Sequence, residues 1–272
     1  IVSPILANIY LHELDTYIEE VLIPQYTRGD KRERSPEYRE VSYKLDRARK
    51  RGDKEAARHL EQRMRSIPSK VTDDPGFRRL TYVRYADDFI LGFAGTKSEA
   101  EAIKAAIGTF LRDTLHLELS SEKTLITHAR DEHAKFLGYA VSIYHADHKT
   151  SRRKDSGTRQ RSANGRVRLG VPYGLTTELA RRYQRNGKPM SELSLLAFSD
   201  AHIIDTYQAR FRGIAEYYKF AVDRTHLGSL KNVMQSALVR TLAHKYKISV
   251  REVYQKYRST MTVDGQEYRT FQ

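Results

Sequence analysis

Two short runs rich in β-branched and aromatic residues, LTYVRY and FILGF, stand only three residues apart in the chain. Runs of this composition are typical of β-strands, and so short a polar break leaves room only for a tight turn. The sequence therefore predicts an antiparallel hairpin over residues 80–93, with Ala86, Asp87 and Asp88 at its turn. The surrounding fold must then be one that contains an antiparallel sheet.

Asp87 and Asp88 are adjacent carboxylates held at one point of this turn. Because like charges repel, such a pair is normally left in water or given a cation, and carboxylate oxygens suit hard ions such as Mg²⁺ or Mn²⁺. Two such ions about 3.5 to 4 Å apart catalyse nucleotidyl transfer, which requires at least one further carboxylate. The alternative is that the two residues only supply a polar turn, where Asp is common.

The chain is strongly basic, with 48 Lys and Arg residues against 34 Asp and Glu residues and a net charge of +14. Such a field attracts polyanions, so nucleic acid is the first candidate partner, although many proteins are basic without binding it. The absence of cysteine excludes disulfides and thiolate chemistry. No apolar run is long enough for a membrane span, which favours a soluble intracellular protein without a membrane partner.

The first half of the chain alternates between helical and strand patterns. Apolar residues at three- and four-residue steps predict a helix over residues 4–22. The densely charged segment 26–76 is predicted to be a surface insertion, helical in its second charged stretch, residues 44–65. Ser98 and Glu101 form the pattern of a capping box that starts a further helix. The predicted order after the hairpin is helix, strand and strand, at residues 98–111, 115–119 and 135–144.

Residues 149–168 differ from the rest of the chain in their charge. They carry eight cationic side chains against Asp155 alone, and they contain few apolar residues. Concentrated charge without apolar anchors is typical of segments that do not pack, so this stretch is predicted to be a mobile basic linker.

Beyond this linker the pattern becomes helical. Apolar residues recur at helical spacing over residues 203–218 and again over 230–242, so two helices are predicted to pack on each other. A capping box at residues 249–252 predicts a third, short helix. The dipeptide Asp264-Gly265 predicts a tight hairpin that closes the chain.

Five segments resemble group II intron-encoded reverse transcriptase/maturases and stand in the order of that family: SPILANIYLHELD, RRLTYVRYADDF, LELSSEKTLITHA, AKFLGY and FRGIAEYYKFA. YADD alone is a weak signal, whereas five ordered segments over nearly the whole chain are specific. The resemblance implies an α+β fold: a partial reverse-transcriptase palm, with an antiparallel sheet and packed helices, followed by an α-helical thumb/maturase domain. The implied divisions are a partial palm at 1–145, a basic linker at 146–190 and the helical domain with its C-terminal hairpin at 191–272.

The resemblance also implies a set of site residues. Asp87 and Asp88 would hold the catalytic Mg²⁺ or Mn²⁺ ions, and Lys123 would be a catalytic residue close to the nucleotide phosphates. Nucleotide or primer contacts are implied for Ser3, Pro4, Asn8, Tyr85, Ala86, Phe136, Leu137, Gly138 and Tyr139. RNA contacts are implied for Arg210, Arg212, Lys219, Lys231, Arg240 and Lys245. The concentrated charge of the linker separately predicts contacts with RNA phosphates, with a solvated tether as the alternative, for Lys149, Arg152, Arg153, Lys154, Arg159, Arg161, Arg166 and Arg168.

Several of these residues also have an ordinary structural explanation. Helix capping accounts for Ser3 and Pro4. Strand packing accounts equally well for Phe136 and Leu137, and a lysine such as Lys123 is as readily a solvated side chain. These alternatives stay open at the level of the sequence.

The resemblance implies RNA-directed DNA synthesis by two-metal nucleotidyl transfer, together with intron RNA binding for splicing and mobility. The partners would be intron RNA, an RNA template with a DNA primer, and deoxynucleoside triphosphates, in the cytoplasm of a bacterium or in an organelle. One alternative is a splicing maturase that binds RNA without polymerase chemistry. Another is a metal-dependent phosphohydrolase.

The chain departs from the family in one respect. The family's palm uses a further catalytic aspartate on a strand before the SPILANIY helix, and the fingers precede that strand; neither is found in these residues. Asp15 does not plainly replace that aspartate, because it falls three turns into a predicted helix. The chain by itself is therefore expected to be inactive as a polymerase.

Overall fold

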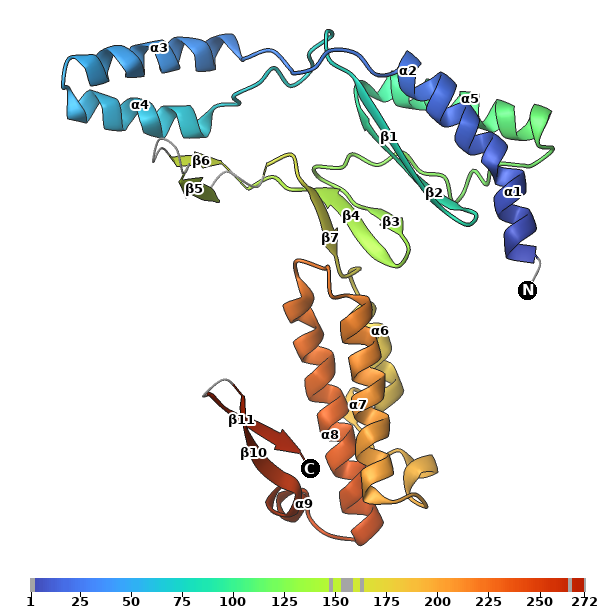
Figure 1. The fold of residues 1–272 in the computed structure, drawn as a ribbon. Coiled ribbons are helices and arrows are strands. Elements are labelled where there is room, and N and C mark those ends of the chain that lie inside the picture. Colours follow the sequence, from blue (N-terminus) through green and yellow to red (C-terminus); the bar gives the residue numbers. More distant parts are fainter. Residues whose placement is uncertain (1–2, 147–148, 153–158, 162–163, 264–265, 272) are drawn as a thin grey trace. The chain divides into compact units, whose positions relative to one another are not determined.

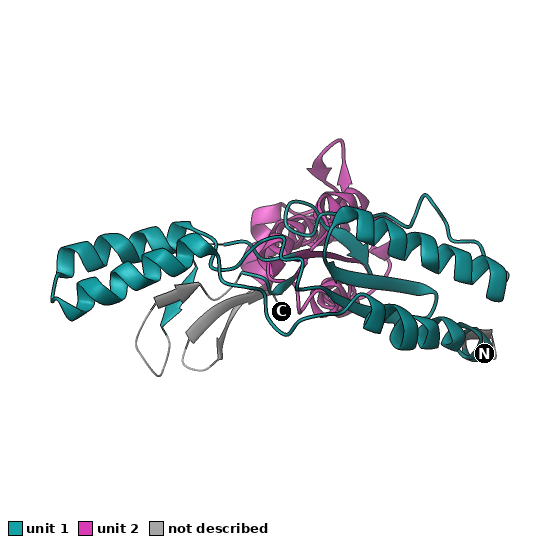
Figure 2. Cartoon of the chain, turned by 90° about the horizontal axis from the view of Figure 1, so that it is seen from above, with its two compact units in different colours: residues 1–137, 143–167 teal, residues 138–142, 168–272 magenta. Residues whose placement is uncertain are grey.

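The computed structural model describes residues 3–146, 149–152, 159–161, 164–263 and 266–271. The chain divides into two compact units, one of residues 1–137 and 143–167, the other of residues 138–142 and 168–272 (Figure 2). Both units contain helices and strands (Figure 1), which confirms the predicted α+β class. None of the helices in the described residues is long and apolar enough to cross a membrane.

The core of the first unit lies between its N-terminal helix, α5 (Lys97–Thr114), and the hairpin of β1 (Arg79–Tyr85) and β2 (Asp88–Ala94). The N-terminal helix is the predicted one, but it changes winding along its length: α1 (Ser3–Thr16) continues as a π-helix (Tyr17–Leu22) and ends as α2 (Ile23–Gln25). Its buried side chains meet those of α5 in one apolar cluster, formed by Leu14, Ile18, Leu22, Leu80, Ile103, Ile107, Leu111 and Leu115.

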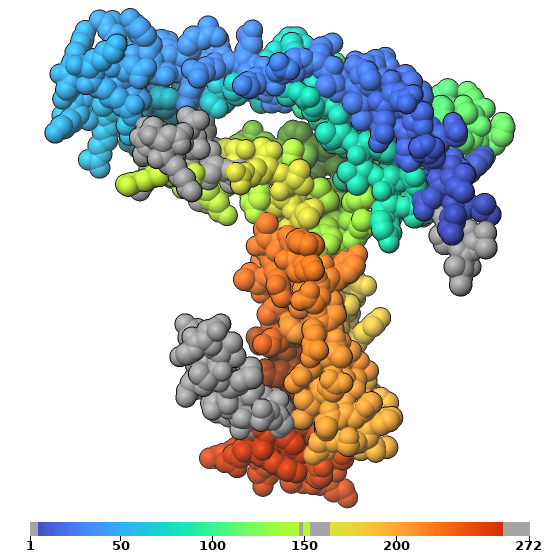
Figure 3. All heavy atoms as spheres, in the orientation of Figure 1, coloured from blue at the N-terminus to red at the C-terminus, as the bar shows by residue number. Residues whose placement is uncertain are grey.

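The charged segment between these elements forms a helical hairpin, α3 (Pro36–Lys50) and α4 (Lys54–Ser66). Residues 44–65 were predicted to be helical, but the structure begins the first helix earlier, at Pro36, and breaks the helical stretch at Gly52, whose φ is +74°. Asp53 then caps α4 by accepting a hydrogen bond from the backbone N–H of Ala56 at 2.9 Å. The two helices pack on each other and project from the rest of their unit (Figure 3).

The start of α5 differs from the prediction. Thr96, not Ser98, is the N-cap: its Oγ1 accepts from the backbone N–H of Glu99, and the Glu99 carboxylate accepts from the backbone N–H of Thr96 at 2.9 Å. Glu99 also accepts from Arg78 Nε at 2.6 Å, which favours this cap over the alternative. The predicted Ser98–Glu101 capping box is therefore wrong.

The predicted strand at 115–119 is also wrong, because these described residues form no strand. The chain leaves α5 through His116, whose φ is +52°, and the backbone N–H of Leu117 returns to Leu111 O at 2.9 Å. Leu115 is buried and Leu119 packs against the same cluster. Leu117 between them is exposed. This alternation arises because the loop covers the core, not because these residues pair in a β-sheet.

The predicted strand at 135–144 is interrupted by a turn. β3 (Ala134–Phe136) and β4 (Tyr139–Ile143) flank Leu137 and Gly138, whose φ values are +46° and +71°. Two successive positive φ values are typical of a type I′ turn. The aromatic and β-branched composition of the run was informative, but Gly138 was the signal for the break.

Strands also occupy part of the stretch predicted to be a mobile linker. β5 (Thr150–Arg152) pairs antiparallel with β6 (Arg159–Arg161), and β7 (Val167–Gly170) pairs with β4. The described part of this stretch therefore contains paired strands, and its mobility stays a prediction. Arg153 and Lys154 lie outside them, and the side chains of Arg159 and Arg161 are likewise not described.

The second unit is mainly helical, and its core lies between α7 (Asp200–Tyr217) and α8 (Leu227–Tyr246), which confirms the predicted helix pair. The predicted capping box of α9 (Val250–Tyr257) is confirmed by the bond from the backbone N–H of Ser249 to Glu252 Oε2 at 2.7 Å. The remaining elements are α6 (Leu175–Ala180), β8 (Gln184–Arg185), β9 (Lys188–Pro189), the closing hairpin β10 (Arg258–Val263) with β11 (Gln266–Phe271), and 3₁₀ turns at Arg181–Tyr183, Leu193–Leu195 and Arg224–His226.

Asp200, the first residue of α7, ties together the ends of three helices. Its carboxylate accepts hydrogen bonds from Lys245 Nζ at 2.8 Å, from Tyr246 Oη at 2.6 Å and from Tyr257 Oη. Burial by itself would raise the pKa of this carboxyl, but the bonds from Lys245 and the two tyrosines outweigh it and lower the pKa to about 2.

Asp200→Asn is expected to lower the free energy of unfolding by about 1 to 2 kcal/mol near neutral pH. A depressed folded-state pKa stabilises fully above the ordinary value of about 4, and this contribution is lost as the pH falls towards about 2. The unfolding curves of the variant and the wild type, measured in urea, should therefore converge over that range. Asp205→Asn on an exposed position of the same helix is the control and should change little; a pH-independent deficit at Asp200 would contradict the assignment.

Candidate active site and nucleic-acid surface

The turn of the β1–β2 hairpin is the centre of the candidate site. Tyr85 is paired with Asp88, so Ala86 and Asp87 are the only two residues of the loop. Ala86 has a φ of +54°, whereas Asp87 is not among the residues with positive φ. A positive φ at the first central position alone is the pattern of a type II′ turn, whose twist matches that of the paired strands.

The backbone at Ala86 is strained, because a positive φ is unfavourable for an alanine and costs roughly 1 to 3 kcal/mol. Ala86→Gly should relieve this strain at a smaller entropic penalty, so we expect the free energy of unfolding to rise by about 0.5 kcal/mol. Ala94→Gly, at the end of β2 where φ is not positive, should instead lower it by a similar amount. Urea unfolding of both variants measures this, and a destabilised Ala86→Gly protein would show that the turn is not strained.

Arg84 holds this turn against helix α1. Its Nη1 donates to the carbonyl oxygen of Ala86 at 2.7 Å and to Asn8 Oδ1 at 2.9 Å. Its Nε and Nη2 donate to the two carboxylate oxygens of Asp15 at 2.8 and 2.5 Å. Tyr82 Oη donates to the same carboxylate at 2.8 Å. One guanidinium therefore joins the turn backbone to two side chains of the helix.

Burial and pairing set the charges in this network. The hydrogen bond from Arg84 is the main cause of the lowered pKa of Asp15. Burial, followed by the hydrogen bond to Asp15, raises the pKa of the Tyr82 hydroxyl. The side chains of Arg84 and Asp15 are 12% and 21% exposed, so the pair is largely shielded from solvent. Asp15 is thus a charged partner of Arg84, which agrees with its not replacing a metal-binding aspartate.

Sequence reasoning did not identify Arg84 or Tyr82 as functional residues. The sequence did contain a signal. Tyr82 and Arg84 are two residues apart on a strand and therefore share a face, and a cation on a face that packs against a helix needs an acidic or polar partner. Asn8 was predicted to lie beside the nucleotide. Its Oδ1 accepts a hydrogen bond from Arg84, so Asn8 contacts the same guanidinium that holds the turn.

The side chains of Asp87 and Asp88 are exposed at adjacent positions of the hairpin. Their oxygens are ligands of the type that Mg²⁺ and Mn²⁺ prefer. Among the described residues, no group of three or more His, Asp or Glu side chains is arranged to hold a metal ion. The donor type therefore fits a divalent ion, but two carboxylates are fewer ligands than a complete coordination shell requires.

Lys123 and the residues of α1 add less to this geometry. Lys123 lies exposed in a turn after α5, and its catalytic role stays a prediction. Ser3 begins helix α1, but the side chains of Ser3 and Pro4 are not described. Tyr85 is 66% exposed beside the turn, where it is free of core packing.

Gly138 and Tyr139 lie against the end of α7 within the second unit. Tyr218 Oη donates to the carbonyl oxygen of Gly138 at 3.0 Å, and Tyr139 Oη donates to that of Tyr217. A Cβ atom on Gly138 would lie 3.0 Å from Tyr217 Oη, so both the positive φ and the close contact favour glycine. Phe136 and Leu137 are half-buried, which suits either packing or primer contact.

The predicted RNA-binding cations whose side chains are described fall into two groups. Some are already paired within the second unit: Arg168 with Asp223 at 2.7 Å, Arg210 with Glu192 at 2.7 Å and Lys245 with Asp200 at 2.8 Å. Lys219 lies 3.8 Å from Glu216. Others are exposed and have no carboxylate partner among the described residues, namely Lys149, Arg152, Arg166, Arg212, Lys231 and Arg240. The second group is the better placed to meet phosphates.

Known proteins match the chain in both units. Residues 52–141 match the family model for reverse transcriptase (RNA-dependent DNA polymerase), and residues 174–271 match the one for type II intron maturase. The chain is 32% identical to the group II intron-encoded protein LtrA of Lactococcus lactis subsp. cremoris, over 91% of this chain and 43% of that protein.

Two fungal proteins show a similar likeness. The chain is 31% identical to the COX1/OXI3 intron 1 protein of Saccharomyces cerevisiae, over 91% of this chain and 30% of that protein. It is 32% identical to an uncharacterised 91 kDa protein in the cob intron of Schizosaccharomyces pombe, over 97% of this chain and 33% of that protein. The chain thus spans less than half the length of these relatives.

An acidic hairpin turn in an α+β unit, followed by a mainly helical unit with exposed cations, is compatible with a reverse-transcriptase domain followed by an intron maturase domain. The two family models match these parts in the same order. The chain belongs to the group II intron reverse transcriptase/maturase family.

Proposed function

We propose that this chain carries the metal-binding turn of an RNA-directed DNA polymerase, using Mg²⁺ or Mn²⁺. The observation that supports this most directly is the type II′ turn that presents Asp87 and Asp88 side by side and is held by Arg84. Divalent ions bound there would activate the attacking oxygen and stabilise the leaving one. The proposal includes a partial palm at 1–145, a basic segment at 146–190 and a thumb/maturase domain at 191–272.

The chain's own residues have separate parts in this proposal. Asp87 and Asp88 supply charge, and Arg84 fixes the turn from which they project. Lys123 neutralises phosphate charge on a bound deoxynucleoside triphosphate. Gly138 and Tyr139 form a surface against which a DNA primer on an RNA template can lie. Hydrogen bonds with Tyr217 and Tyr218 hold this surface in place.

Because the described residues bring no third carboxylate to the turn, we expect this chain alone to extend a DNA primer on an RNA template only at background rate. The measurement is primer extension by the purified chain with Mg²⁺ and then Mn²⁺. A protein of this family with a complete metal site is the positive control. Robust extension by the chain alone would show that its two aspartates suffice and would overturn the proposed division of ligands.

The second proposed function is binding of intron RNA for splicing and mobility, inside a bacterium or an organelle. It is favoured by the exposed, unpaired cations among the described residues and by the match to the maturase family model. Phosphate contacts of this kind position an RNA without reading its sequence. A protein that kept only this function would bind RNA without copying it.

Arg152, Arg153 and Lys154 changed together to Ala should flatten the dependence of RNA affinity on salt. Each lost phosphate contact lowers the magnitude of the slope of log affinity against log salt by about 0.7 to 0.9. The slope of the triple variant should therefore be smaller by roughly 2 to 3. Sequence preference should barely change. The measurement is RNA affinity across a salt series, and superimposable lines for variant and wild type would exclude phosphate contacts from this segment.

A further inference from the structure

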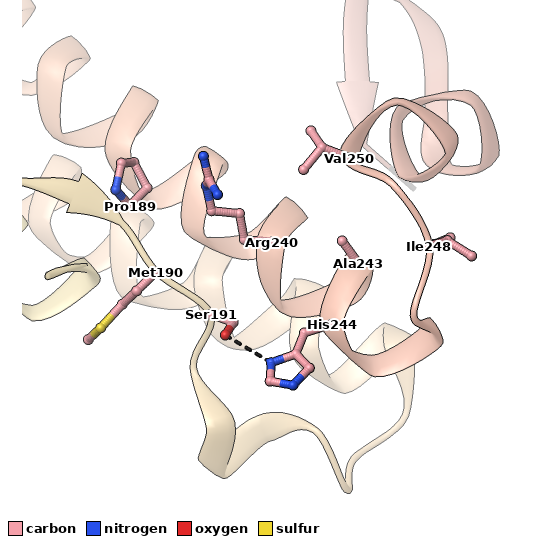
Figure 4. A pocket seen from close by; sticks show the side chains of 8 residues that line it. All are labelled: Pro189, Met190, Ser191, Arg240, Ala243, His244, Ile248 and Val250. Carbon is pink, nitrogen blue, oxygen red and sulfur yellow. Dashed lines mark hydrogen bonds between the residues drawn. The ribbon is translucent and has the colours of Figure 1, made fainter.

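The second unit contains a hollow of about 420 Å³ between β9, the C-terminal half of α8 and the start of α9 (Figure 4). This volume falls within the range of roughly 300 to 1,000 Å³ that is usual for small-ligand sites. Its lining combines apolar and polar side chains, from Pro189, Met190, Ser191, Arg240, Ala243, His244, Ile248 and Val250.

The walls of the hollow are fixed by backbone structure. Lys247 ends α8 in the left-handed region, at a φ of +54°, and the backbone N–H of Ile248 bonds to Ala243 O at 3.1 Å. The capping box of α9 then fixes Val250. On the opposite wall, the backbone N–H of Met190 donates to Tyr183 O at 3.0 Å. A site built on helix ends and a short hairpin is formed before any ligand arrives.

The polar groups of the hollow suit an anion. None of the described residues places an acidic side chain in its lining. Arg240 is exposed and, among the described residues, has no carboxylate partner, unlike Arg210 and Lys245 on the same unit. Ser191 Oγ and His244 Nδ1 are 3.1 Å apart, as drawn in Figure 4, so the hydroxyl and the imidazole add further hydrogen-bonding groups to the lining, at the end away from the Arg240 guanidinium.

We propose that this hollow holds one unpaired nucleotide of a bound RNA strand, with a phosphate on Arg240 and the base against Pro189 and Val250. This rests on the RNA binding proposed above and assigns it a specific site. A phosphate alone would leave the apolar wall unused, whereas a nucleotide matches both halves of the lining. A free mononucleotide would gain little in so open a hollow, but a strand adds phosphate contacts outside it.

Four variants that each lower the net charge by one unit separate this site from general electrostatics. Arg240→Gln and Val250→Asp change the hollow, and an aspartate is favourable in the first turn of α9. Arg212→Gln and Gln235→Glu make the same charge change at exposed positions outside the lining. All four should lower the salt slope for a short single-stranded RNA by up to about 0.7.

The hollow variants should lose about tenfold more affinity than the controls, in the range expected for one base contact. They should also lose preference for the intact RNA over the same strand with abasic riboses. In the wild type, 4-thiouridine in the strand should cross-link to the peptides around Pro189 or Val250. Thermal unfolding checks that each variant is folded. If Val250→Asp does not fold, the comparison of Arg240→Gln with the two controls still tests the site.

Equal losses in all four variants, with RNA still bound, would overturn the site while leaving the proposed RNA-binding function in place. Absence of RNA binding by the wild-type chain would overturn both. If poly-glutamate competes for the hollow and no RNA cross-link forms there, the hollow belongs to an acidic protein partner, and the nucleotide proposal is wrong.

Discussion

Asp87→Asn in an active protein that contains this chain is expected to reduce cDNA synthesis by roughly a thousandfold, because a metal ligand supports several kcal/mol of transition-state stabilisation. The amide has nearly the same shape, and Asp87 is exposed in the turn, so folding and RNA affinity should hardly change. The measurement is single-turnover primer extension together with RNA affinity.

Asp46→Asn on the exposed side of α3 is the matched control, since it removes the same charge away from the hairpin. It should extend primers at the wild-type rate. Extension by Asp87→Asn at that same rate would remove Asp87 from the site and favour a polar turn without metal. A comparable loss of RNA affinity would instead indicate damage to the binding surface.

The elements that could be predicted from the sequence are those whose signals are local. The β1–β2 hairpin follows from two β-rich runs and a short break, and the capping box at Ser249 and Glu252 follows from four consecutive residues. The packing of α7 on α8 follows from two apolar stripes joined by a short connection.

The start of α5 shows where local signals fail. Thr96 with Glu99 and Ser98 with Glu101 both fit the capping-box pattern. The structure uses the first pair, and Glu99 also contacts Arg78, which stands 21 residues earlier. A contact at that separation decides between two equal local patterns, and it cannot be read from the four residues of a capping box.

The candidate site divides in the same way. Asp87 and Asp88 were predictable because the turn that presents them is local. Arg84 was missed because its role depends on Asp15, 69 residues earlier, and on the carbonyl oxygen of Ala86. The cations of the second unit were predictable as a group, but which of them are paired depends on tertiary contacts such as Arg210 with Glu192.

The second large effect is expected at Arg84. Arg84→Met should lower the free energy of unfolding by about 3 kcal/mol, because it leaves the largely shielded Asp15 carboxylate without its cation. Adding Asp15→Asn to this variant should recover much of the loss, since the uncompensated charge is then gone. Arg79→Met, an exposed position on the same strand, is the control and should cost under about 1 kcal/mol.

The dependence on pH distinguishes a charge effect from lost packing at Arg84. In the wild type, Arg84 lowers the pKa of Asp15, so the stabilisation is complete above the ordinary pKa of about 4 and is lost as the pH falls below it. The difference between wild type and Arg84→Met, measured by urea unfolding, should therefore narrow on acidification. A difference that stays constant with pH, or a double variant no more stable than Arg84→Met, would mean that Arg84 supports the turn by packing and by its other hydrogen bonds, not by pairing with the Asp15 charge. The hydrogen bond to Ala86 O would then hold the aspartates without help from the charge of Asp15.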